Sequence, residues 1–446
     1  MILPQEKVCV IGLWHLGAVT SACLADFGYQ VVGVDKDVSR VEGLNSGRPP
    51  IYEPGLDELV SENLTSGKLR FTTDLREAAL GATHILIAYD TPVDENDEVD
   101  LSGVFATVEE LAAHMDDGTT IIISSQVPVG TCAKLIDKIH QTKPTLAFSI
   151  ACVPENLRLG QAIERFKHPE FLVIGADDPV VHERVEQLLS VIDAPKVKTD
   201  LLTAEMTKHA INAYLATAIS FGNEIANLCD EVGADALKVV QALRLDSRVS
   251  SKAPLNPGLG FAGGTLARDM KVLCGVGREK GYAAPLLNGV LQVNEGQNGR
   301  VVARLKRVCP SLRGRVIGVL GLTYKAGTST LRRSAAVEII RSLTAEGATV
   351  RAYDPKVDPV ELQPHLDSFT FCSDPYAAAT GSDALILVTE WPEFKELDFQ
   401  RIRSLLRNPI LLDTQNMLDA DRLSQMGFVY QGVGRGRQPQ GGITSR

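Results

Sequence analysis

The sequence predicts an α/β protein with two doubly wound domains joined by a long central helix, and three observations lead to this prediction. Over residues 7–35, a β-branched strand, a glycine turn, a helix with apolar residues at helical spacing and a second strand ending in an acid follow one another. The same order returns over residues 313–354. Between these units, the segment that begins at Leu201 has no glycine or proline until Gly222, as expected for one long helix. Strand–helix–strand units of this kind build the parallel sheets of Rossmann-like domains.

The length of the chain requires more than one hydrophobic core, because 446 residues exceed what a single core serves. We expect a first Rossmann-like domain over residues 1–200, a central helical segment over 201–300 and a second Rossmann-like domain over 310–435. Residues 436–446 are rich in Gly, Arg and Gln and are expected to form a disordered tail.

The composition excludes several classes of protein. The net charge of −10 argues against a nucleic-acid partner, which would require a basic patch. No apolar run reaches the roughly 18 residues of a membrane helix, and the start does not read as a signal peptide, so we expect a cytoplasmic protein without a membrane partner. The eight cysteines are scattered, with no CxxC pair and no Cys/His cluster. We therefore expect neither a metal site nor a disulfide framework, and interpret them as reduced thiols packed as small hydrophobic residues.

The first glycine turn predicts a dinucleotide site. Gly12 and Gly17 fill the first and last places of a GxGxxG pattern, and Asp35 follows about 20 positions later, where an NAD ribose is normally held. The charge of Asp35 would repel a 2′-phosphate, which favours NAD over NADP. Trp14 stands in place of the middle glycine. Either its side chain pushes the phosphates outward, or the unit no longer binds a dinucleotide.

Polar residues follow three further strand-like segments, 83–92, 119–131 and 146–160. Ligands of open α/β sheets lie beyond the carboxyl ends of the strands. The polar residues at these ends are Thr91, Pro92, Ser125, Gln126, Glu155 and Asn156.

The long helix is too apolar for a lone surface helix, so we expect it to be buried between domains or in a dimer interface. Lys208 and Asn212 lie one helical turn apart on it and share a face. The lysine either extends its ammonium group to water or acts as a positioned cation or base.

A glycine-dense loop, Gly258–Gly264, leads through Thr265 into a helix that carries Arg268 and Asp269. Backbone this bare is expected to lie close to a ligand.

At this point nine stretches, in the same order along the chain, resemble the UDP-glucose/GDP-mannose dehydrogenase family of nucleotide-sugar dehydrogenases. They are YEPGLDELV, SSQVPVGT, VPENLRLG, KHAINAYLA, DSR, GFAGGTLARD, GLTYKAGT, YDP and TEW. The resemblance implies an NAD-binding N-terminal domain, a dimer-forming central helix and a C-terminal domain that binds the UDP moiety, with the sugar between them. It also implies oxidation of the sugar C6 alcohol through an aldehyde to a carboxylate, with two NAD.

The resemblance and the strand-end pattern together give the candidate residues. Those expected to be catalytic are Lys208, Asn212, Asp269 and Glu155. Those expected at the cofactor are Gly12, Trp14, Leu16, Gly17, Asp35, Arg40, Thr91, Ser125 and Arg332. Those expected at the substrate are Leu157, Gly260, Phe261, Gly263, Thr265, Lys325 and, from the partner subunit of a homodimer, Arg248.

The sequence departs from the family at the residues of the second oxidation. Thr265 stands in place of the nucleophilic cysteine, Gln126 in place of a threonine that helps position water, and Leu159 in place of a second glutamate; Arg268 replaces a lysine. A hydroxyl is a poor nucleophile without an adjacent base, and no histidine lies within ten residues of Thr265. Cys274, nine positions further on, is either a displaced nucleophile or a buried structural thiol.

The hypothesis is therefore an NAD-dependent oxidoreductase that acts on a CH–OH group of a nucleotide sugar, a UDP-sugar by family default, in one two-electron step. The product would be a 6-aldehyde or a ketone, or the oxidation would be transient and reversed, as in an epimerase. The alternatives are a full four-electron dehydrogenase that gives a uronate and a non-catalytic protein that binds a nucleotide sugar or NAD.

Overall fold

The structure is a computed structural model that describes residues 6–91 and 99–436. It divides into two compact units, an N-terminal unit of residues 1–211 and a C-terminal unit of residues 212–446. The predicted tail, except for residue 436, and Pro92 lie outside the described residues.

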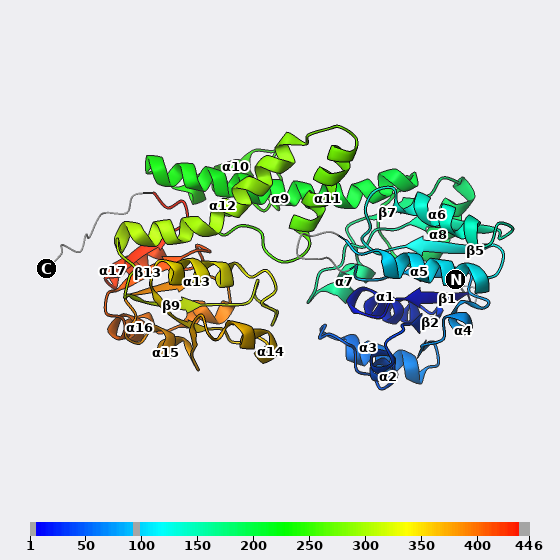
Figure 1. Ribbon diagram of the computed structural model, residues 1–446, viewed down its shortest axis with the longest axis horizontal. Helices are drawn as coiled ribbons and strands as arrows, with labels where there is room; N and C mark the ends of the chain where they lie inside the picture. The colour runs from blue at the N-terminus through cyan, green and yellow to red at the C-terminus, as the bar shows by residue number, and fades with distance from the viewer. Residues whose placement is uncertain (1–5, 92–98, 437–446) are drawn as a thin grey trace. The chain divides into compact units, whose positions relative to one another are not determined.

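The N-terminal unit contains one sheet of eight strands in the order β3-β2-β1-β4-β5-β6-β7-β8 (Figure 1). The first six strands follow the 3-2-1-4-5-6 order of a Rossmann fold, and all neighbours are parallel except β6 and β7. The strands are β1 Lys7–Ile11, β2 Gln30–Val34, β3 Leu69–Thr72, β4 His84–Ile87, β5 Thr119–Ile123, β6 Phe148–Cys152, β7 Leu172–Gly175 and β8 Lys196–Thr199.

Helices bury both faces of this sheet, so that alternate residues of each central strand enter different cores. In β1, Val8 and Val10 pack into the core that α1, α3, α7 and α8 cover, whereas Cys9 and Ile11 pack under α4, α5 and α6. The helices are α1 His15–Asp26, α2 Val38–Asn45, α3 Leu56–Thr65, α4 Leu75–Ala79, α5 Ser102–His114, α6 Thr131–Thr142, α7 Ala162–Lys167 and α8 Pro179–Leu188.

The C-terminal unit repeats the Rossmann arrangement, as the sequence predicts. Its sheet has six parallel strands in the order β11-β10-β9-β12-β13-β14, which corresponds strand for strand to the first six of the other sheet. The strands are β9 Val316–Leu320, β10 Thr349–Tyr353, β11 Thr370–Phe371, β12 Ala384–Leu387, β13 Ile410–Asp413 and β14 Val429–Gly432. The helices of this part are α13 Ala335–Ala345, α14 Pro359–Leu362, α15 Pro375–Ala379, α16 Phe399–Leu405 and α17 Ala420–Gln425.

The predicted long helix is α9, Leu201–Val232, which begins in the N-terminal unit and continues into the C-terminal unit. It runs through Gly222 without a break. A Cβ atom at this position would lie 2.5 Å from the carbonyl oxygen of Leu255, so the glycine lets the backbone near Leu255 approach the helix. Three more helices follow: α10 Ala236–Leu245, α11 Leu266–Glu279 and α12 Pro285–Val308.

Within the part of the chain that the structure describes, no helix combines the length and apolar character that crossing a membrane requires. Nor do the described residues bring three or more His, Cys, Asp or Glu side chains together in a way that suits a metal ion.

Candidate active site

The two outer glycines of the first turn are explained by close packing. Gly12 has φ of 89°, and a Cβ atom there would lie 2.6 Å from the Tyr89 ring. A Cβ atom at Gly17 would lie 1.7 Å from the carbonyl oxygen of Gly12. No other residue fits at Gly17, so α1 packs directly onto the end of β1, as in dinucleotide-binding folds.

The N-terminus of α1 has the form of an anion site. Its N-cap residue, Trp14, makes no side-chain capping hydrogen bond, which leaves first-turn N–H groups for a ligand. One of them, the N–H of Leu16, lies 3.3 Å from the Asp90 carboxylate. The sequence analysis did not single out Asp90, although an acid three positions after the end of β4, the strand that neighbours β1, is a signal in its own right.

The structure brings Trp14, Asp35 and Arg40 together. The Asp35 carboxylate accepts hydrogen bonds from the backbone N–H of Leu13 and from the Arg40 guanidinium, both at 2.7 Å. The same guanidinium lies 5.1 Å from the centre of the Trp14 ring, within the range of a cation–π contact. The indole is 41% exposed. It therefore lies on the Asp35 side of the turn, at the end of β2.

The corresponding acid of the C-terminal unit is Asp354, and it is fully occupied by protein donors. Its Oδ2 atom accepts hydrogen bonds from the N–H of Leu322 at 2.7 Å, from the N–H and hydroxyl of Thr323 at 3.0 Å, and from the Trp391 indole at 3.1 Å. Asp354 therefore has a structural role in the C-terminal unit.

Thr91 and Ser125 join the ends of adjacent strands. The Thr91 hydroxyl donates to the carbonyl of Gln126 at 2.8 Å, and the Ser125 hydroxyl donates to that of Ile87 at 3.2 Å. Both side chains are buried and keep lone pairs that a ligand can use.

Lys208 lies beside Glu155 and Asn156, two residues beyond the end of β6. Its ammonium donates to the Asn156 side chain at 3.2 Å and lies 3.6 Å from the Glu155 carboxylate. Glu155 also accepts the N–H of Leu157 at 2.6 Å. Lys208, Glu155 and Gln126 line a cavity of about 10 Å³, which is room for roughly one water molecule.

Asp269 is fully buried in the first turn of α11. The Asn212 amide donates a short hydrogen bond to it, and the Arg268 guanidinium lies 3.4 Å from its other oxygen. Both partners stabilise the ionised carboxylate. Asn212, Arg268 and Asp269 thus form one polar cluster in the C-terminal unit.

Most glycines of the loop before α11 are required by close packing within the C-terminal unit, whether or not a ligand binds there. A Cβ atom at Gly260 would lie 2.5 Å from the Asn294 amide oxygen, and one at Gly263, where φ is 78°, would lie 3.1 Å from the Tyr324 ring. Asn294 also bonds both backbone groups of Phe261. Of the four glycines of this loop, Gly264 alone has open space where a Cβ atom would lie, so packing within this unit does not explain why that position is a glycine.

Thr265 is the exposed N-cap residue of α11, and its side chain makes no capping hydrogen bond. Cys274 lies nine residues further on, about two and a half helical turns away and on the opposite face. Its thiol is buried, and burial raises its pKa.

All eight cysteines are free and buried. Cys152 lines the small cavity beside Lys208. Its thiol is hydrogen-bonded to that of Cys132, and this bond together with burial raises the pKa of Cys132. Burial likewise raises the pKa of Cys9 and of Cys23 to about 12. None of these thiols has the exposed, electropositive surroundings of a reactive cysteine.

Three further predicted residues lie at the surface or in loops. Arg248 is exposed and forms a two-point ion pair with Asp246, at 3.0 and 2.7 Å. Arg332 is exposed, and the Lys325 ammonium lies 5.4 Å from the Tyr324 ring.

A doubly wound sheet with a glycine turn before its first helix and an acid at the end of its second strand is the arrangement of a dinucleotide-binding domain, the class found in NAD-dependent dehydrogenases. Comparison with known proteins agrees. Residues 6–193 match the NAD binding domain of the UDP-glucose/GDP-mannose dehydrogenase family, residues 202–296 its central domain and residues 318–420 its UDP binding domain.

The chain is 38% identical to UDP-glucose 6-dehydrogenase TuaD of Bacillus subtilis (strain 168), over 97% of this chain and 94% of that protein. It is also 38% identical to a UDP-glucose 6-dehydrogenase of Rhizobium meliloti (strain 1021), over 96% of this chain and 99% of that protein. The structure of a UDP-glucose dehydrogenase from Pyrobaculum islandicum superposes with a TM-score of 0.88 at 32% identity, and covers 97% of this chain and 98% of that one. The chain belongs to the UDP-glucose/GDP-mannose dehydrogenase family, and it is an NAD-dependent nucleotide-sugar dehydrogenase.

Proposed function

We propose that this dehydrogenase oxidises one CH–OH group of a UDP-sugar to a carbonyl in a single two-electron step. The observation that carries the proposal is Thr265, an exposed hydroxyl at the N-cap of α11. The second oxidation of the family chemistry needs a sulfur nucleophile that forms a thiohemiacetal, loses hydride to give a thioester and is released by water. Every thiol of this chain is buried, so none is placed to replace it.

The first oxidation needs only groups that this chain retains. Bound NAD would supply the acceptor for the hydride of the alcohol carbon, and a base of the protein would take the hydroxyl proton as the carbonyl forms. We assign the proton to the Asp269 carboxylate, directly or through a water molecule, because this buried acid is positioned by the Asn212 amide and the Arg268 guanidinium. Lys208, with Glu155 and Asn156 beside it, is assigned as the cation that stabilises negative charge on the substrate oxygen.

The residues of the N-terminal unit fit NAD. We assign its pyrophosphate to the N-terminus of α1 and its adenosine ribose to Asp35, with Trp14 and Arg40 at the same end of the site. The remaining assignments are Thr91, Ser125 and Arg332 for the cofactor, and Leu157, Gly260, Phe261, Gly263, Thr265, Lys325 and, from the partner subunit of a homodimer, Arg248 for the substrate.

The reaction is tested by counting NADH for each sugar consumed. A single oxidation of an alcohol by NAD is unfavourable at neutral pH, so a carbonyl trap such as semicarbazide is included. We expect one NADH per UDP-sugar and a trapped carbonyl product. Thr265→Cys restores the missing nucleophile and is expected to raise the number of NADH formed per sugar above one. Thr265→Ser is the matched control, for which we expect one NADH per sugar. Two NADH and a uronate from the unmodified enzyme would show that the single-step proposal is wrong.

Asp269→Asn removes the assigned base while keeping the shape of the side chain. We expect kcat to fall by about 10²–10⁴-fold, as for loss of a general base. NAD affinity should be unchanged, because every assigned cofactor residue except Arg332 lies in the other unit. Thr265→Ala is the companion variant and should retain its turnover. The assignment is wrong if Thr265→Ala is inactive and Asp269→Asn is not.

Asp90→Asn removes a negative charge from the assigned pyrophosphate site. Because two like charges at close range repel one another, we expect the variant to bind NAD several-fold more tightly at low salt, with the gain shrinking as salt is added. Binding can be followed by the fluorescence of exposed Trp14, since the only other tryptophan, Trp391, is buried in the C-terminal unit. Glu109→Gln, which removes an exposed charge on α5, serves as the control. Equal NAD affinity in both variants would place the phosphates elsewhere.

We further propose a homodimer that pairs through α9. Tyr214, Phe221 and Leu228 follow one another at intervals of seven residues, and each is between 45% and 60% exposed. A seven-residue repeat keeps these side chains on one face of the helix, which is the pattern of a helix that pairs with another.

The double variant Phe221→Glu/Leu228→Glu places charge on this face. It is expected to reduce the molar mass measured by light scattering from that of two chains to that of one, while Val180→Glu, an equally exposed apolar site on α8, leaves it unchanged. A dimer that survives the double substitution would rule out pairing through this face.

A further inference from the structure

The backbone of the glycine loop is held by buried side-chain amides from two helices. Asn223 of α9 accepts the N–H of Gly258 at 2.9 Å and donates to the carbonyl of Leu259 at 2.8 Å. Gln297 of α12 donates to the carbonyl of Gly258 at 2.8 Å. Asn223 and Gln297 are 1% and 0% exposed. Both backbone groups of Gly258 are thus bonded to side chains rather than to secondary structure.

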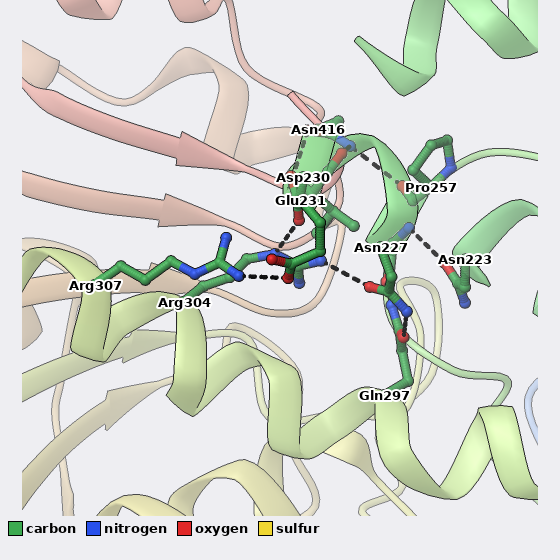
Figure 2. A network of polar contacts seen from close by, with 11 residues as sticks. Asn223, Asn227, Asp230, Glu231, Pro257, Gln297, Arg304, Arg307 and Asn416 are labelled. Atoms are coloured by element: carbon green, nitrogen blue, oxygen red, sulfur yellow. Dashed lines mark hydrogen bonds and ion pairs between the residues drawn. The ribbon is translucent and has the colours of Figure 1, made fainter. Parts of the chain in front are cut away.

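These amides belong to a longer chain of hydrogen bonds, which Figure 2 shows between α9 and α12. The Asn227 amide donates to the Gln297 oxygen at 2.9 Å, and Arg304 donates to the Asn227 oxygen at 3.0 Å. Arg304 is itself buried and paired with Asp230 at 2.8 Å. The chain runs without a gap from Asp230 to the loop.

The direction of every bond in this chain is set by Arg304. A guanidinium has donors only, so the oxygen of Asn227 must face it and the amide nitrogen of Asn227 must face Gln297. The oxygen of Gln297 is then turned toward Asn227, and its nitrogen toward the carbonyl of Gly258. An amide that turned over would place two donors or two acceptors against each other, at a cost that is large in a buried site.

We propose that Gln297 and Arg304 are positioning residues for the oxidation: the polarised chain from Arg304 through Asn227 and Gln297 fixes the glycine loop in its substrate-binding conformation. The proposal rests on the assignment of this loop to the substrate. A glycine-rich segment has more backbone freedom to lose than any other. If the loop is already held in one conformation before the sugar binds, binding does not lose this conformational entropy, which is the physical meaning of preorganisation.

A matched pair of residues lies next to this chain and serves as the control. Arg307 of α12 pairs with Glu231 of α9 at 2.7 Å, one position beyond Asp230 on α9 and three beyond Arg304 on α12. Both side chains are about half exposed, and Figure 2 shows them at the edge of the network. An exposed pair of this kind contributes little, so Arg307→Met removes an ion pair between the same helices without altering the polarity of the amides.

The test variants are Gln297→Leu and Arg304→Met, and the controls are Arg307→Met and Val301→Ala. The second control makes a cavity in a fully buried part of α12. Hydrogen exchange of the peptide that covers residues 257–264 is measured in each protein, together with KM for UDP-glucose, kcat, NAD affinity and the melting temperature. In Gln297→Leu and Arg304→Met we expect the amides of Gly258 and Phe261 to exchange about tenfold faster and KM to rise about tenfold, the size expected when one buried hydrogen bond is lost. NAD affinity should stay within about twofold, because every assigned cofactor residue except Arg332 lies in the other unit.

The two controls separate positioning from stability. Val301→Ala is expected to lower the melting temperature with KM and loop exchange unchanged, and Arg307→Met to change none of these quantities. The proposal is overturned if Gln297→Leu folds with unaltered loop exchange and KM, or if Val301→Ala raises KM as much. If the unmodified enzyme oxidises no UDP-sugar, the proposed function fails, while the exchange data still decide whether the amide chain holds the loop.

Discussion

Both Rossmann-like units depend on one hydrogen bond, from the first N–H after the glycine turn to the acid at the end of the next strand. Leu13 donates to Asp35 and Leu322 to Asp354, in each case at 2.7 Å. The bond requires the chain to reverse at Gly12 and Gly321, where φ is 89° and 91°. This reversal sets where each following segment begins. The two acids differ in their other partners: an arginine near an exposed indole for Asp35, and a threonine and a buried tryptophan for Asp354.

The elements that the sequence predicts well are those whose signal is local. The two strand–turn–helix–strand units and α9 follow from periodicity and glycine placement. The roles of the candidate residues stay predictions. Asp90 was missed because its importance comes from the pairing of β1 with β4, which places it near the N–H of Leu16. Likewise, the sequence suggests that Gly260 leaves space for a ligand. In the structure, the side chain of Asn294, 34 positions away, occupies that space.

Buried amides are the hardest class to find from sequence. Asn223 and Asn227 lie one turn apart on a helix, a spacing that is equally common on solvated helix faces. The residues around them in the sequence do not indicate that Gln297, 70 positions after Asn227, packs against this face of α9 and buries it. Only the packing of α9 against α12 distinguishes the two cases. A buried arginine that needs acceptors is the feature that explains why the amides are there.

The directed chain from Arg304 to Gly258 has a consequence for the chemical ageing of the protein. Deamidation would replace the donor nitrogen of Asn227 or Gln297 with a second acceptor oxygen, and so place oxygen against oxygen at the next link. The usual route begins with attack on the side chain by the backbone nitrogen of the following residue. Asn227 lies within α9 and Gln297 within α12, where helical hydrogen bonds and geometry hold that nitrogen away. The two helices therefore protect the covalent identity of the amides whose orientation the loop requires.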